Sequence, residues 1–235
     1  MPSPTPPPSS SSPPRRAPRR PQEGPVIIGV TGGIAAGKTT VSRILAEEFG
    51  AHVISADEIG HQLLQPGEEV YEEVVRRHGG RVLNPDGTVN RRALARIVFS
   101  DRRELDWLNR LSHPRIVERV RRELSRLRRE LPPGSLVVVD AALLFEMGLG
   151  GDVDYVIAVV APDEVRLERL KDQGMAEGEA RARMAAQMPQ EEKAERADFV
   201  VDGSAPLEEV RKRLREIVTS ISRLGRGQEE NSHNR

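Results

Sequence analysis

The segment VTGGIAAGKTT, residues 30–40, limits the fold of this chain more than any other part of its sequence. It follows the apolar run Val26–Ile28 and matches the pattern G-x-x-x-x-G-K-[ST] from Gly32 to Thr39. Glycines let the backbone wrap closely around phosphate oxygens, and a helix that starts near Lys38 would turn its positive end toward them. The segment therefore predicts a strand, a phosphate-binding loop and a helix in succession. An ordinary glycine-rich turn between a strand and a helix is the alternative.

Two side chains of this loop bring specific chemistry. Lys38 is expected to reach the β- and γ-phosphates of a nucleotide, and the Thr39 hydroxyl is expected to ligate Mg²⁺. The predicted nucleotide-binding residues are Gly33, Ile34, Ala35, Ala36, Gly37, Lys38, Thr39 and Thr40.

The chain continues as an alternation of β-branched apolar runs and longer segments with helical periodicity. This pattern is typical of βαβ units, and it predicts an α/β fold with a parallel five-stranded sheet flanked by helices. The expected strands are Val26–Val30, His52–Ser55, Leu136–Asp140, Tyr155–Val160 and Phe199–Val201. The expected helices are Lys38–Phe49, Pro162–Lys171, Glu177–Gln187 and Pro206–Ile221.

Residues 57–131 interrupt the alternation, because they contain helical periodicity and turns but no convincing buried strand. The stretch HPRIVERVRRELSRLRREL, which starts at His113, predicts a long amphipathic helix. We expect a single domain over 26–222 with this helical insertion. The Pro-, Ser- and Arg-rich residues 1–25 and the polar residues 223–235 are expected to be disordered tails.

Composition excludes several classes of function. The chain has 36 basic and 36 acidic residues, so no net positive field favours nucleic acid or an anionic membrane surface. It has no cysteine, which excludes disulfides, thiolate metal sites and thiol nucleophiles. No apolar stretch approaches the roughly 20 residues of a membrane helix. We expect a cytoplasmic protein without nucleic-acid or membrane partners, either a monomer or a weak homo-oligomer.

Two aspartates follow predicted strands, at the sheet edge where ligands bind in open parallel sheets. Asp57 can orient and deprotonate an attacking hydroxyl, or it can serve only as a cap of the helix that follows. Asp140 follows four apolar residues, an arrangement that in phosphate-binding loop proteins holds Mg²⁺. Phosphoryl transfer also needs positive charge above the phosphates. The candidates are Arg166, Arg169, Arg181 and Arg183.

The order of motifs from Val26 to Ile221 resembles the dephospho-coenzyme A kinase family of phosphate-binding loop kinases. The segments that carry the resemblance are TGGIAAGKTT, SADEIG, DGTVNRRAL, WLNRLSHPRI, VVVDAALLFE and ADFVVDGSAPLEEV. The resemblance implies transfer of the ATP γ-phosphoryl group to the ribose 3′-hydroxyl of dephospho-coenzyme A, with Mg²⁺. It also implies a nucleotide core, a helical acceptor-binding region over about 57–131 and a lid over about 162–188.

The same resemblance implies roles for individual residues. Asp57 resembles the proposed general base, and Arg169 resembles a lid arginine directed at the phosphates. Arg91 and His113 resemble residues on the substrate side, although the His113–Pro114 pair is also an ordinary way to begin a helix. Gln187 and Lys193 match family positions, but the sequence gives no role for them.

The chain also departs from the family pattern. Ala142 replaces a usual proline, Gln173 stands where a second lid arginine is frequent, and Gly203 replaces an asparagine. If the missing arginine neutralises charge, Arg181 or Arg183 has to compensate. Ser55 replaces a frequent aspartate. Ala35 and Ala36 stand where glycine and serine are more common.

Two other functions are compatible with a phosphate-binding loop. A nucleoside monophosphate kinase or another small-molecule kinase would share the scaffold, but the insertion of some 75 residues favours a larger acceptor. A GTP-binding switch would need an N-K-x-D segment, which the sequence lacks.

Overall fold

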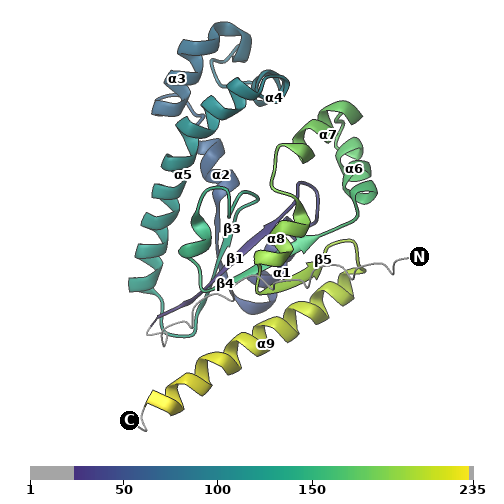
Figure 1. Cartoon of the computed structure of the whole chain (residues 1–235). Helices are drawn as coiled ribbons and strands as arrows, with labels where there is room; N and C mark the ends of the chain where they lie inside the picture. Colours follow the sequence, from purple (N-terminus) through teal and green to yellow (C-terminus); the bar gives the residue numbers. More distant parts are fainter. Residues whose placement is uncertain (1–23, 233–235) are drawn as a thin grey trace, which may run out of the picture.

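The computed structural model describes residues 24–232, with side chains described up to residue 223. The tail expected over 1–25 therefore lies almost entirely outside the described residues. Five strands, all parallel, form one sheet in the order β2-β3-β1-β4-β5 (Figure 1). The strands are β1 Val26–Gly32, β2 His52–Ser55, β3 Leu136–Asp140, β4 Tyr155–Val160 and β5 Phe199–Asp202. This confirms the predicted fold class; only the ends of β1 and β5 lie further along the chain than expected.

Helices cover both faces of the sheet because alternate residues of the central strands point to opposite sides. On one face Ile27, Val137 and Val139 pack in the same cluster as α5, Arg102–Glu130. On the other face Ile28 and Val138 pack with α1, Lys38–Phe49, and α9, Leu207–Ser232. The sheet is therefore buried between two helical layers, as its nearly continuous apolar strands predict.

The segment between β2 and β3 folds as helices that extend away from the sheet (Figure 1). An isolated bridge between Leu83 and Val89 is the sole β-pairing within the described residues 57–131. The helices are α2 Ala56–Gln62, α3 Glu69–His78, the 3₁₀ turn η1 Gly79–Val82, α4 Arg91–Ser100 and α5.

Helix α5 begins at Arg102, eleven residues before the start expected from the His113–Pro114 pair. Asp101 caps this helix, since its carboxylate accepts a hydrogen bond from the Arg103 N–H at 2.8 Å. Pro114 consequently lies inside the helix and on its exposed side.

After η2, Leu149–Gly151, and β4, the chain forms three short helices before β5. They are α6 Asp163–Asp172, α7 Glu177–Ala185 and α8 Gln190–Arg196; α8 was not expected from the sequence. Helices α6 and α7 lie within residues 162–188, the segment for which a lid is expected and which is called the lid below. They stand opposite the insertion, above the same edge of the sheet (Figure 1).

The C-terminal boundary also differs from the expectation. Helix α9 continues to Ser232, past residue 222, where the sequence analysis ends the domain. No proline interrupts this segment, and its Gln and Glu residues are compatible with helix propagation. The tail expected over 223–235 is therefore helical backbone as far as Ser232.

Candidate active site

The glycine-rich segment forms a tight loop between β1 and α1. Gly37 precedes the first residue of α1 with a φ of 103°, a left-handed conformation that glycine adopts without a Cβ clash. Ala35 also has a positive φ, 61°, and it is the only non-glycine residue with one in the described part of the chain. That conformation costs an alanine about 1–2 kcal/mol. The surrounding structure must therefore hold the loop in place.

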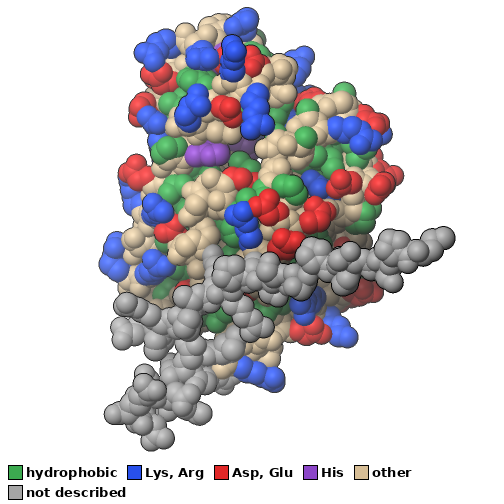
Figure 2. Space-filling view, viewed as in Figure 1, with side chains coloured by type: hydrophobic (Ala, Val, Ile, Leu, Met, Phe, Trp, Pro, Cys, Tyr) green, Lys and Arg blue, Asp and Glu red, His purple; other side chains and the backbone are tan. Residues whose placement is uncertain are grey.

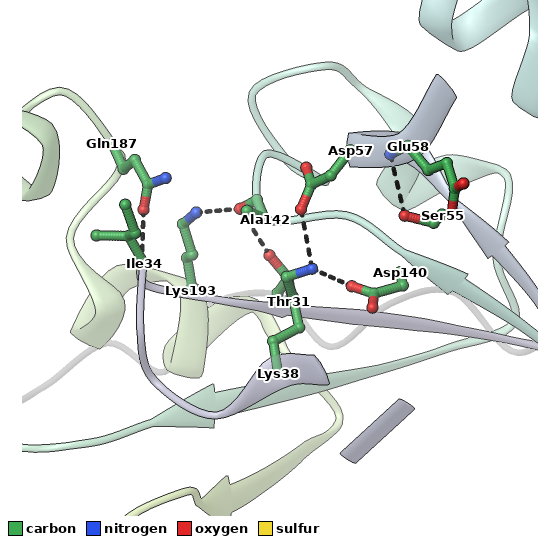
Figure 3. Close-up of polar contacts among 10 residues, drawn as sticks. All are labelled: Thr31, Ile34, Lys38, Ser55, Asp57, Glu58, Asp140, Ala142, Gln187 and Lys193. Atoms are coloured by element: carbon green, nitrogen blue, oxygen red, sulfur yellow. Dashed lines mark hydrogen bonds and ion pairs between the residues drawn. The ribbon is translucent and has the colours of Figure 1, made fainter. Parts of the chain in front are cut away.

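Side chains from the lid hold this loop. Arg166 Nε donates to the Ile34 carbonyl at 3.0 Å, and Arg169 Nη1 donates to the Ala35 carbonyl at 3.0 Å. The Ile34 N–H donates to Gln187 Oε1 at 2.9 Å (Figure 3). The strained part of the loop thus has its backbone groups fixed by three lid residues.

Arg169 also joins the loop to the turn after β5, because its Nη2 donates to the Gly203 carbonyl at 2.8 Å. A Cβ at position 203 would lie 1.9 Å from the Ala36 carbonyl oxygen. Only glycine permits this close approach of two backbones. In this chain Gly203, which departs from the family pattern, allows the turn to pack against the phosphate-binding loop.

Lys38 lies between two carboxylates at the sheet edge (Figure 3). Its Nζ is 3.1 Å from Asp57 Oδ2 and also contacts Asp140 Oδ1. Burial on its own would lower the pKa of Lys38, but the two carboxylates outweigh this effect and the pKa is raised. Lys38 therefore stays charged at neutral pH.

The register of the sheet brings these groups together. Asp140 is paired with Val30 of β1 on one side and with Ser55 of β2 on the other. The ends of β2 and β3 are therefore level, beside β1, which continues to Gly32. Lys38 follows β1 and Asp57 follows β2. This agrees with the expectation that both aspartates lie at the carboxyl edge of the sheet.

The alternative role of Asp57 as the helix cap is wrong. Ser55 is the N-cap of α2, and its Oγ accepts a hydrogen bond from the Glu58 N–H at 3.1 Å (Figure 3). The Asp57 carboxylate is free of that task and faces Lys38, with 51% of the side chain exposed. An exposed carboxylate in this position is accessible to an acceptor hydroxyl.

A cavity of about 860 Å³ opens above these residues. Its lining includes nine predicted site residues: Gly33, Ile34, Ala35, Gly37, Lys38, Thr39, Thr40, Asp57 and Arg169. Arg169 and Gln187 line it from the lid, and Ala142 and Leu143 line it from the segment after β3. Asp140 and Ala36 are buried beneath this surface. The cavity has the size of a site for a drug-sized or nucleotide-sized molecule.

Arg91 and His113 do not line this cavity. Arg91 is exposed at the start of α4, and its charge, together with the larger effect of burial, lowers the pKa of His61. His61 lies one turn after Asp57 on α2, where the charges of Asp57 and Arg91 both act on it, and it was not among the predicted site residues. Burial lowers the pKa of His113, opposed by the nearby Glu146. The two predicted acceptor residues therefore lie on the insertion side, beyond the cavity wall.

The lid places Gln173 and the two arginines considered above in different surroundings. Gln173 lines the cavity. Arg181 and Arg183, the two arginines considered as substitutes for the missing one, do not line it, and their compensation stays a prediction. Arg181 is paired with Glu177 at 2.8 Å, and Arg183 is paired with Glu179 at 2.7 Å. Among the four candidates, Arg166 and Arg169 contact the loop. On the visible face of the molecule, basic and acidic side chains occur together over both the insertion and the lid (Figure 2).

The sequence assigns no role to Gln187 or Lys193, and it does not indicate that Arg166 contacts the Ile34 carbonyl. Lys193 has no exposed surface and lies beside Glu146. Its burial is not visible in the sequence, because a lysine in a short polar helix ordinarily faces solvent.

No helix within residues 24–232 is both long and apolar enough to cross a membrane. Within the same residues, no group of three or more His, Cys, Asp or Glu side chains forms a ready-made metal site.

Comparison with known proteins identifies relatives over most of the chain. A family model described as dephospho-CoA kinase matches residues 26–209. The dephospho-CoA kinase of Moorella thermoacetica is 43% identical over 198 residues, which cover 84% of this chain and 92% of the relative. That of Geobacter sulfurreducens is 42% identical over 81% of this chain and 96% of the relative.

Two solved structures are also similar to this chain over most of its length. TT1252 from Thermus thermophilus aligns with a TM-score of 0.67 and 36% identity, over 84% of this chain and 97% of that one. Dephospho-CoA kinase from Campylobacter jejuni aligns with a TM-score of 0.60 and 27% identity over the same shares.

Proposed function

The chain belongs to the dephospho-CoA kinase family, and from this premise we propose that it transfers the γ-phosphoryl group of ATP to the ribose 3′-hydroxyl of dephospho-CoA. The observation that carries the proposal is the placement of Asp57 and Lys38 at one end of the cavity that the phosphate-binding loop lines. A phosphoryl donor and a hydroxyl acceptor can meet there, with a positive charge and a base on either side of the transferred group.

The loop is the donor half of the site. Its backbone N–H groups at the start of α1 are suited to phosphate oxygens, and Lys38 supplies a fixed positive charge. The Lys38 ammonium contacts both Asp57 and Asp140. We expect it to turn toward the β- and γ-phosphates of ATP, which releases the Asp57 carboxylate for the acceptor.

Asp57 is the general base in this proposal. The 3′-hydroxyl donates a hydrogen bond to the carboxylate, and its proton passes to Asp57 as the oxygen attacks the γ-phosphorus and ADP leaves. Arg169 contacts the Ala35 carbonyl and lines the same cavity, which supports a role in neutralising charge on the phosphates. Arg91 and His113 are proposed to contact the acceptor from the insertion.

The residues present suit Mg²⁺, which prefers oxygen ligands and usually takes one or two from protein and the rest from phosphates and water. The Asp140 carboxylate and the Thr39 hydroxyl are such oxygens, at the end of β3 and at the start of α1. When bound, the ion would neutralise charge on the β- and γ-phosphates.

The test is a panel of acceptors assayed with ATP for ADP release. Dephospho-CoA should be phosphorylated, AMP should not, and CoA, whose 3′-hydroxyl already carries phosphate, should be inert. Phosphorus NMR of the product should show a new phosphomonoester on the ribose. Turnover of AMP without turnover of dephospho-CoA would instead support the nucleoside monophosphate kinase.

A further inference from the structure

Lys193, on α8 at the base of the lid, is a cation that the proposed reaction does not use directly. The side chain is completely buried, and it does not line the cavity. Burying an ammonium group costs several kcal/mol unless it is paired and hydrogen-bonded, so an apolar side chain would satisfy the packing at lower cost. Burial lowers the pKa of Lys193, and only the neighbouring Glu146 opposes this effect.

The two polar contacts of the Lys193 ammonium go to the segment that follows Asp140. Its Nζ donates to the Ala142 carbonyl and lies 3.0 Å from Glu146 Oε1. Glu146 Oε1 also accepts a hydrogen bond from the Met188 N–H at 3.0 Å. The segment 142–146 and the base of the lid are therefore joined by one ammonium group and one carboxylate.

The Ala142 carbonyl accepts hydrogen bonds from two donors. Besides Lys193 it accepts a hydrogen bond from Thr31 Oγ1 at 3.1 Å, and Thr31 belongs to the strand that leads into the phosphate-binding loop (Figure 3). The family pattern usually has a proline at position 142, which would stiffen this turn; alanine does not. In this chain the rigidity of the turn depends more on its hydrogen bonds.

The same contacts reach the phosphate-binding loop from the other side. Met188 follows Gln187, whose Oε1 accepts the Ile34 N–H. Anchoring Met188 to Glu146 therefore restricts where Gln187 can lie. Lys193 thus has one connection to the cavity wall at Ala142 and another, through Glu146 and Met188, to the loop.

We infer that Lys193 is a positioning residue for phosphoryl transfer, which acts through the Ala142 carbonyl and Glu146 to keep the segment after Asp140 and the base of the lid aligned with the phosphate-binding loop. The inference rests on the proposed function for the reaction that is measured. A residue that only stabilises the fold would affect the free energy of unfolding, whereas a positioning residue affects the rate of the reaction. Misalignment of reacting groups by about 1 Å lowers the rate up to roughly a hundredfold, while substrate contacts in the cavity persist.

Lys193→Met tests the inference because it keeps the length of the side chain and removes its charge and donors. We expect kcat to fall between about tenfold and a hundredfold, with both KM values within about threefold of wild type. The assay is run well below the unfolding temperature of each variant, determined by circular dichroism. Lys171→Met is the matched control, because Lys171 is an exposed lysine of α6 paired with Glu177. Its kcat should stay within about twofold of wild type.

Glu146→Gln is a milder second variant that keeps an oxygen acceptor for the Met188 N–H and removes the negative charge. We expect a smaller fall in kcat. The double variant Lys193→Met/Glu146→Gln should be no slower than Lys193→Met alone, because the two side chains act as one unit. If the fall in kcat of the double variant equals the product of the two single falls, the two side chains act independently and this expectation is contradicted.

The absence of cysteine from the chain allows a rescue at this single position. Lys193→Cys is alkylated with 2-bromoethylamine in denaturant and refolded, which restores an ammonium group at lysine length; iodoacetamide gives a neutral adduct. Wild type passes through the same treatment as the refolding control. The ammonium adduct should recover most of kcat relative to the neutral adduct.

Hydrogen exchange gives a measure that does not depend on activity. The Met188 amide should exchange faster in Lys193→Met than in wild type or Lys171→Met, because its acceptor is no longer fixed. If wild type fails to phosphorylate dephospho-CoA, the proposed function fails while this measurement still tests the anchoring. A kcat within about twofold of wild type, or unchanged Met188 exchange, in folded Lys193→Met overturns the inference.

Discussion

At the start of α2, Ser55 caps the helix and Asp57 faces Lys38. Ser55, where the family often has aspartate, caps the helix with its hydroxyl. A serine cap adds no negative charge beside Asp57 and Asp140, so Lys38 needs to balance only those two carboxylates. Lys38, Asp57 and Asp140 together carry a formal charge of −1, against −2 with an aspartate cap, and the two carboxylates offset the free-energy cost of burying Lys38.

Asp57→Asn is expected to lower kcat by about 10² to 10⁴, because an amide cannot accept the proton of the 3′-hydroxyl. ATP affinity, measured by calorimetry, should be little changed, since the loop and Arg169 keep their contacts. Glu58→Gln is the control: Glu58 is the next residue of α2 and its side chain does not line the cavity. A near-normal kcat for Asp57→Asn would assign the base to another group.

Residues within sequence motifs could be placed from the sequence, whereas residues that act across the fold could not. Asp140 ends β3, and Lys38 and Asp57 follow β1 and β2, so the order of elements and the strand register predict their convergence. Gln187 and Arg166 reach Ile34 from more than 130 positions away. Their contacts depend on how the lid folds back, and no local periodicity encodes that.

At the scale of elements, the insertion shows where local signals mislead. A proline is favourable in the first turn of a helix, so the His113–Pro114 pair predicts a helix start. Asp101 and the apolar positions of α5 favour an earlier start, and packing of Ile116, Val120 and Leu124 against the sheet stabilises the whole helix. Tertiary packing therefore outweighs the cost of an internal proline.

Pro114→Ala should stabilise the protein by about 2 kcal/mol, because an internal proline costs a helix about 3 kcal/mol and rigidity of the unfolded chain returns up to about 1 kcal/mol. Urea unfolding measures the change. Pro132→Ala, at a proline just after α5, is the control and should be neutral or slightly destabilising. Loss of stability in Pro114→Ala would mean that the contacts of the proline ring contribute more than an internal proline costs the helix.

At the scale of the whole molecule, the sheet was predictable and the placement of the lid was not. Continuous apolar strands and the intervening helices predict a parallel sheet covered on both faces, and the two core clusters match this. The lid and the insertion, however, meet through a surface contact. The Arg183 guanidinium lies 5.0 Å from the centre of the Phe99 ring, which joins α7 to α4. Neither residue belongs to a motif.

This contact links the lid to the insertion on which the proposed acceptor residues lie, so we expect it to contribute to substrate retention. Arg183→Gln removes the cation and keeps a side chain that can bond Glu179. A cation–π contact that is partly shielded from water is worth about 1 kcal/mol, so KM for dephospho-CoA should rise roughly fivefold. Arg181→Gln is the matched control, because Arg181 lies on the same helix, is exposed and is paired only with Glu177. Initial-rate measurements of both variants at fixed ATP decide the matter: equal KM values would show that the lid stays closed without Arg183, and that the contact with Phe99 only buries surface.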